Sequence, residues 1–207
     1  MKDEAPFYVD PFVGFKGFLL GYQEFDGVPL LQSTVRRQVV WYPAQRSRPS
    51  YVEDNLLRAT CEKPTPGYYH PKNRPVPDEK CTCGMWAYRT LEDAKSDVYL
   101  SHLTNTFWLR QARIQKGEDP KIPKWRTSVS AYSVMAVVWV WGRVFVNEIT
   151  MRGEYMRIAA LCSDTAADPA HLSAVSEAFS VPLVPLEFIR DHAEALPGIL
   201  CVPGREY

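Results

Sequence analysis

The sequence predicts an α+β fold in which a curved antiparallel β-sheet or small β-barrel is followed by two C-terminal helices. The clearest strand is the apolar, β-branched run at residues 134–140, which suits a strand buried on both faces. Strand-like segments also lie near residues 15–42, and an Asp-Pro pair at residues 168–169 is typical of a helix start. With 207 residues and 46% hydrophobic composition, residues 1–207 are expected to form a single domain.

The N-terminal part is expected to contribute an arm at residues 1–10 and then three strands. Residues 12–22 are rich in aromatic residues and glycine, and the Asp26-Gly27 pair that follows is a strong hairpin signal. We therefore expect one strand before this pair and a second strand at residues 28–34. The apolar end of residues 35–42 predicts a third strand.

An insertion at residues 55–126 is expected to separate these strands from those of the second half. Thr90 is a good N-cap, and Asp93 stands at the third helical position, so a helix is expected to start there. The elements expected in and just before this insertion are a short helix within residues 51–60, a short strand at residues 85–89 and a helix from Thr90 to about Lys116, ended by Gly117. That helix is expected to be either straight or broken near Ser101-His102.

The second half is expected to complete the sheet and then form a helical segment at residues 163–207. Asp168 at the cap and Pro169 at the first position predict the first helix of that segment. The expected order is a strand at residues 134–140, a turn at Trp141-Gly142-Arg143, an alternating segment at residues 144–149, a strand or short helix at residues 155–162, a helix at residues 169–179, an extended segment at residues 180–185 and a last helix at residues 186–195.

A cluster of zinc-type ligands lies in the proline-rich part of the insertion. Cys61, His70, Cys81 and Cys83 supply four ligands of the kind that Zn²⁺ prefers in a tetrahedral site. Gly84 would let the chain turn tightly after the last pair. Because four protein ligands leave no open position, the pattern predicts a structural zinc site. The alternative is a set of buried thiols with an exposed His70.

Several blocks of the sequence resemble a family of uncharacterised proteins common in actinobacteria and their phages. That family has a Cys, a His-x-x-Pro, a Cys-x-Cys-Gly-Ile-Tyr-Ala block, a strand ending in Trp-Gly-x-Val and a Glu-x-Gly-x-Arg-Ala segment. The matching blocks here are Ala59-x-Cys61, His70-Pro71, Cys81-x-Cys83-Gly84-x-x-Ala87, Trp141-Gly142-Arg143-Val144, Glu148 and Arg152.

The chain also departs from the family pattern. Met85-Trp86 replaces Ile-Tyr, His70 is followed directly by Pro71, and Thr150-Met151 stands where the family has a glycine and an aromatic residue. The resemblance implies that the cysteine and histidine residues belong together as one metal site. It also implies a bacteriophage or actinobacterial origin, but it brings no biochemical function with it.

Nucleic-acid binding is one function that the charge pattern favours. The chain has no net charge, but residues 32–130 carry 17 basic and 10 acidic side chains, while both ends are acidic. Basic groups bind phosphates, and neighbouring aromatic rings stack on bases. The alternative is that the segments fold together and neutralise one another. The candidate basic residues are Arg36, Arg37, Arg46, Arg48, Lys72 and Arg74.

Protein–protein interaction is the second hypothesis, because Trp and Arg are the side chains that most often anchor interfaces. Trp108, Arg113 and Trp125 fall within one segment of the insertion. Such a protein would act as an adaptor or as an inhibitor of a host protein. The sequence favours a regulatory or accessory binding protein that contacts nucleic acid or a nucleic-acid-processing protein.

An enzyme is the third hypothesis, although no G-x-S-x-G, P-loop or dinucleotide fingerprint is present. Trp141, Glu148 and Arg152 would then line a pocket for a nucleotide-like ligand; the alternative is an ion-paired strand surface. His171 and His192 are expected to be solvated helix residues. The longest apolar run is too short for a membrane span, and the N-terminus has no signal pattern, so a cytoplasmic protein is expected.

Overall fold

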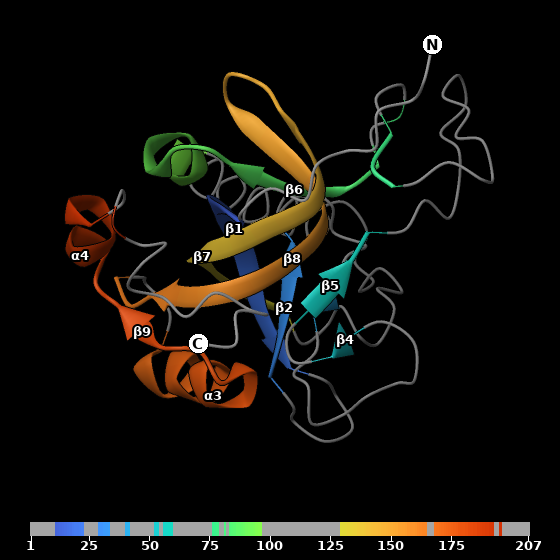
Figure 1. Ribbon diagram of the computed structural model, residues 1–207. Helices are drawn as coiled ribbons and strands as arrows, with labels where there is room; N and C mark the ends of the chain where they lie inside the picture. The colour runs from blue at the N-terminus through green and yellow to red at the C-terminus, as the bar shows by residue number, and fades with distance from the viewer. Residues whose placement is uncertain are drawn as a thin grey trace, which may run out of the picture.

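The computed structural model describes residues 11–22, 29–33, 40–41, 52–53, 56–59, 76–78, 81, 83–96, 129–164, 168–192 and 195. Figure 1 shows a strongly curved sheet with helices on both sides. The elements are β1 (Phe12–Tyr22), β2 (Pro29–Ser33), β3 (Val40–Trp41), β4 (Val52–Glu53), β5 (Leu56–Arg58), β6 (Met85–Tyr88), β7 (Val129–Val146), β8 (Thr150–Cys162), α3 (Pro169–Phe179), β9 (Leu183–Val184) and α4 (Leu186–Asp191). Residues 91–96 are also helical.

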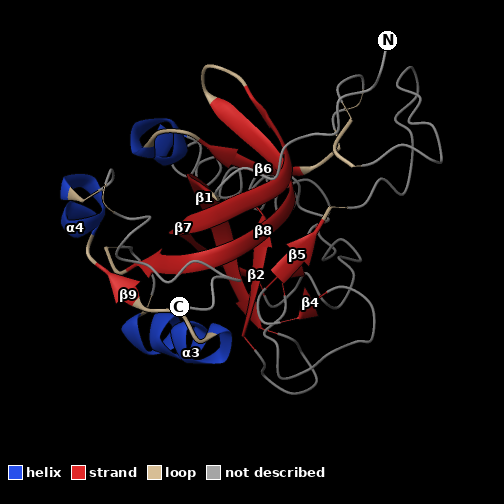
Figure 2. Cartoon of the chain, viewed as in Figure 1, coloured by secondary structure: helices blue, strands red, loops and turns tan. Residues whose placement is uncertain are grey.

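The described strands form one sheet, and its two long strands β7 and β8 organise the rest (Figure 2). β7 pairs with β1 along one edge and with β8 along the other, antiparallel in both cases. The other edge of β8 pairs with three short strands one after another along its length, first β6, then β5 and then β9. Of these, β9 runs parallel to β8 and the other two run antiparallel. β6 also pairs with β1, so β1, β7, β8 and β6 form a closed ring of strands.

This ring is not a regular barrel, because β1 and β6 share a single residue pair, Phe15 with Tyr88. Their backbones nevertheless approach closely. A Cβ added at Gly14 would stand 2.9 Å from the Cβ of Ala87. Only glycine allows this approach, which brings the two strands together at the point of closure.

The core has two parts because β7 is buried on both faces, as its sequence predicts. Val134, Ala136, Val138 and Val140 of β7 point into the inner core, which also includes the buried face of α3. Its odd-numbered Met135 and Val137 point into a smaller outer core. Leu91 and Ala94 of the helical residues 91–96 and Ile189 of α4 cover that outer core.

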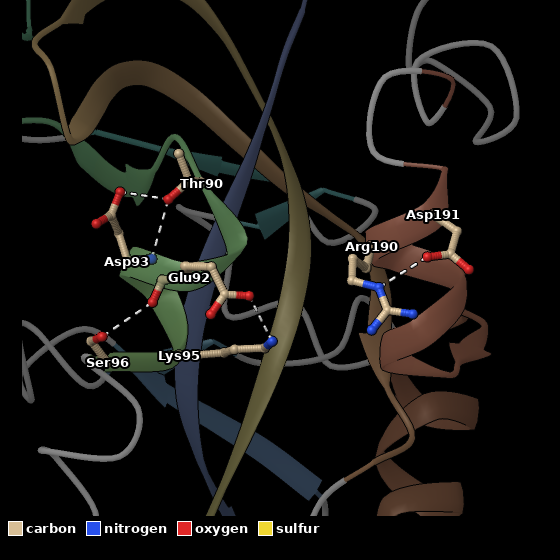
Figure 3. A network of polar contacts seen from close by, with 7 residues as sticks. All are labelled: Thr90, Glu92, Asp93, Lys95, Ser96, Arg190 and Asp191. Atoms are coloured by element: carbon tan, nitrogen blue, oxygen red, sulfur yellow. Dashed lines mark hydrogen bonds and ion pairs between the residues drawn. The ribbon is translucent and has the colours of Figure 1, made fainter.

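The helix starts follow the sequence closely. α3 begins at Pro169, and the side chain of Asp168 accepts a hydrogen bond from the amide of Ala170 at 3.0 Å. At the earlier helix, the amide of Asp93 donates to the Thr90 hydroxyl at 3.2 Å, and that hydroxyl donates back to the Asp93 carboxylate at 2.5 Å (Figure 3). Both predicted caps are therefore confirmed.

Two sequence predictions about local structure are wrong. The expected turn at residues 141–143 is a bulge within β7, where Gly142 has a φ of +78° and the strand continues to Val146. The expected short helix within residues 51–60 is a hairpin of β4 and β5. Its second strand is fixed by pairing with residues 155–157 of β8, so long-range pairing overrides the local pattern.

Among the described helices, none has both the length and the apolar character that a membrane crossing requires.

Candidate functional site

Cys81 and Cys83 lie in a turn that leads into β6, and we call Val76–Asp78, Cys81, Cys83 and Gly84 the cysteine turn. Both cysteine side chains are buried, with 7% and 3% of their surface exposed. The amide of Cys81 donates to the carbonyl of Asp78 at 3.1 Å. Gly84 has a φ of +120°, and a Cβ there would stand 3.0 Å from the Cβ of Pro77. The tight turn expected at this glycine is therefore present.

Arg152 of β8 ties the cysteine turn to the sheet. Its Nη1 atom donates to the carbonyl oxygen of Cys81 and, at 3.0 Å, to that of Cys83. The guanidinium also lies 5.7 Å from the ring centroid of Trp86 and 4.7 Å from that of Phe145. These two residues face Arg152 on the neighbouring strands β6 and β7, so strand register places the cation between the two rings.

A second row of arginine and aromatic side chains crosses three adjacent strands. Arg58 of β5 pairs directly with Tyr155 of β8, and its guanidinium lies 5.6 Å from the tyrosine ring centroid. The Tyr155 ring stacks on Trp141 of β7, with 5.8 Å between centroids and 23° between planes. Arg58 also forms a 3.4 Å ion pair with Glu154.

The three residues predicted to line a ligand pocket lie in different surroundings. Trp141 belongs to the row with Tyr155, whereas Arg152 holds the cysteine turn. Glu148 is exposed in the turn that joins β7 to β8, and its carbonyl oxygen accepts from Arg89 at 3.3 Å. The pocket stays a prediction, since these contacts, within the described residues, join none of the three side chains to another.

Lys16 and His171 are buried titratable residues that lie outside the predicted sites. Lys16 is 3% exposed, and its Nζ donates to the carbonyl of Trp86 at 2.7 Å, which links β1 to β6 at the ring closure. His171 is buried on α3, so the expectation of a solvated residue is wrong. Burial lowers its pKa, against the opposing effects of the Gly21 carbonyl and Asp168.

Cys162 contrasts with the cysteine turn. It is buried in the outer core. Burial raises the pKa of its thiol, outweighing the backbone hydrogen bond at Asp164 that lowers it. Cys162 is as buried as Cys81 and Cys83 but belongs to the outer core and not to the cysteine turn, which makes it a suitable comparison for them.

Most of the other predicted site residues fall outside the described part of the chain. These are the metal candidates Cys61 and His70 and the partner-binding candidates Arg36, Arg37, Arg46, Arg48, Lys72, Arg74, Trp108, Arg113 and Trp125. Within the described residues, no group of three or more His, Cys, Asp or Glu side chains is arranged to hold a metal ion. The cysteine turn alone thus offers two metal ligands, and a closed four-ligand zinc site also requires Cys61 and His70.

Sequence reasoning missed the partners of Arg152 and, apart from Trp141, the second row. The alternation in residues 150–158 marks the outward side chains of β8, but pairing with Arg58 depends on contacts about 100 residues apart along the chain, which no local pattern reveals. The burial of Lys16 could not be predicted either, because a lysine in a strand normally indicates a solvent-facing position.

Comparison of the chain with known protein families, with curated proteins and with solved structures finds no match.

Proposed function

We propose that the protein is a non-enzymatic binding protein whose insertion is braced by a structural zinc ion and which contacts nucleic acid or a nucleic-acid-processing protein. The observation that carries the metal part is the cysteine turn. Cys81 and Cys83 are buried two residues apart, in a backbone held by Arg152 through both of their carbonyls. Thiolates so placed fit zinc, and Cys61 and His70 would complete four ligands.

This arrangement suits a structural ion better than a catalytic one. Two of the ligands are removed from solvent, and four ligands would leave no position for a substrate or an activated water. When bound, zinc would supply folding free energy to a proline-rich segment with few apolar side chains. The proposed phage or actinobacterial origin and regulatory role rest on the family resemblance.

Substitution of single cysteines tests the metal proposal. Cys81→Ser and Cys83→Ser should each lower both the zinc content per chain and the melting temperature. Cys162→Ser is the matched control, because it also removes a buried thiol but should leave the zinc content unchanged. Normal zinc content in both cysteine-turn variants would exclude these residues as ligands.

A protein partner is the alternative that the tip of the β7–β8 hairpin favours. Val146 and Ile149 are 47% and 52% exposed, which is unusual for large apolar side chains in the described residues. The turn is well ordered, since the Asn147 side chain accepts from the amides of Ile149 and Thr150, and Arg89 donates to the Asn147 carbonyl at 2.9 Å. A rigid apolar tip is typical of a contact site.

Affinity capture from a host lysate tests this alternative. A specific protein retained by the wild type and lost with Ile149→Ser would support the adaptor or inhibitor function. Retention of the same proteins by both would exclude the hairpin tip as the contact.

A further inference from the structure

We infer that the outer face of β5, β8 and β7 is a binding site for single-stranded nucleic acid. This inference rests on the proposed function, and it assigns the contact to residues other than the basic ones that the sequence indicated. We call Arg58, Tyr155, Trp141 and Arg157 the outer row. It is separate from the basic residues at positions 36–74 to which the sequence pointed.

The side chains of the outer row share one face of the sheet. Met156 and Ile158 point into the inner core. Because side chains alternate along a strand, their neighbours Tyr155 and Arg157 point outward. Val140 likewise points inward and Trp141 outward. Strand pairing then aligns Arg58 with Tyr155 and Tyr155 with Trp141 across the sheet.

The charge of this face suits a polyanion. Residues 56–58, 139–146 and 150–158 contain four arginines, and Glu154 is their one acidic residue. Arg152 is occupied by the carbonyls of the cysteine turn. The side chain of Arg58 is 65% exposed, and its 3.4 Å pair with Glu154 is a surface ion pair of small strength. A phosphate can therefore replace or join that contact at little cost.

The aromatic residues define the kind of nucleic acid. Trp141 and Tyr155 are half-buried and stacked at 5.8 Å, with the Arg58 guanidinium 5.6 Å from the tyrosine ring. Exposed ring surface next to cations binds unstacked bases by stacking while the arginines bind the backbone. A duplex keeps its bases stacked on one another, so a single strand fits this surface better.

Fluorescence anisotropy with a labelled oligothymidylate and a labelled oligouridylate, each about 12 nucleotides long, tests the inference. We expect Trp141→Leu to weaken binding by about 5- to 150-fold, as loss of one stacked base does. We expect Arg58→Gln to reduce the slope of log affinity against log salt by about 0.7, as loss of one phosphate contact does. The two oligonucleotides distinguish DNA from RNA as the preferred strand.

Arg190→Gln is the matched control, because it removes an equally exposed arginine on α4, away from the outer row. Arg58→Gln keeps the test valid if Trp141→Leu fails to fold, since the Arg58 side chain is exposed. If the wild type binds and neither Trp141→Leu nor Arg58→Gln differs from Arg190→Gln, the inference is overturned while the nucleic-acid function stands. If the wild type binds neither oligonucleotide at low salt but binds a duplex of the same length, only the inference is overturned. If it binds no form of nucleic acid, direct nucleic-acid contact is overturned as well and a protein partner remains.

Discussion

Replacing Arg152 by methionine should destabilise the protein strongly, because this side chain holds the cysteine turn and also packs between two aromatic rings of the sheet. Its guanidinium donates to the carbonyls of Cys81 and Cys83 and lies against the rings of Trp86 and Phe145. Hydrogen bonds to a charged group contribute about 1.5–3 kcal/mol each, but the two share one donor atom and are not additive. Each ring contact adds about 0.5–1 kcal/mol when partly exposed.

With the shared donor counted once and both ring contacts added, the loss for Arg152→Met is about 2.5–5 kcal/mol in the free energy of unfolding. Arg152→Lys keeps the charge but not the planar fork, so it should lose about half as much. Urea denaturation of the zinc-loaded protein measures both values. The lysine variant should also release zinc to a chelator faster than the wild type, because the turn that carries the two thiols is less firmly held.

Arg157→Met provides the control on the same strand. Arg157 also points outward from β8, and it has no hydrogen bond or ion pair in the described structure. Its substitution should change the free energy of unfolding by less than about 0.5 kcal/mol. If Arg152→Met costs no more than Arg157→Met, then Arg152 does not hold the cysteine turn, and the role assigned to it is refuted.

Three further substitutions test the fold. Gly142→Ala should cost more than about 2 kcal/mol, because φ is +78° and the new Cβ would stand 2.7 Å from the Tyr155 ring; an unchanged urea midpoint would contradict the bulge. Asp168→Ala should cost about 1 kcal/mol through loss of the α3 cap, whereas Asp168→Asn should be nearly neutral in the same assay. His171→Gln should reduce the loss of stability on acidification. Because burial lowers the His171 pKa in the native state, the unfolded chain binds more protons, and stability should fall as pH drops below about 6.5, by at most about 1.4 kcal/mol per pH unit. An identical pH profile in thermal denaturation of both proteins would exclude His171 as the source.

The features that sequence predicts well are those fixed within a few residues. The Asp168 cap, the Thr90–Asp93 cap and the doubly buried strand at residues 134–140 are all present. Each depends on a local hydrogen bond or on continuous apolar character, which a short window contains.

The features that sequence reasoning misses depend on distant pairing. The segment Trp141-Gly142-Arg143 has the composition of a turn. Because β7 pairs with β8 on both sides of Gly142, the segment forms a bulge within the strand. The local sequence around Leu57 is compatible with a helix, but pairing with β8 makes this segment a strand. His171 lies on the face of α3 that packs against the sheet, and this packing buries it.

The candidate site shows the same division. The spacing of Cys81 and Cys83 indicates metal-binding chemistry from the sequence alone. The role of Arg152 depends on register between β6, β7 and β8, which brings it to carbonyls about 70 residues earlier in the chain. Family resemblance adds the idea that the thiols and His70 belong together, and this idea stays a prediction.

Zinc K-edge X-ray absorption of the purified full chain tests the central proposal most directly. A closed site of Cys61, His70, Cys81 and Cys83 predicts three sulfur ligands at about 2.3 Å and one nitrogen at about 2.0 Å. Cys81→Ser should reduce the sulfur count by one or abolish the zinc signal. A protein that contains no zinc, or zinc coordinated mainly by oxygen, would contradict the proposed structural site.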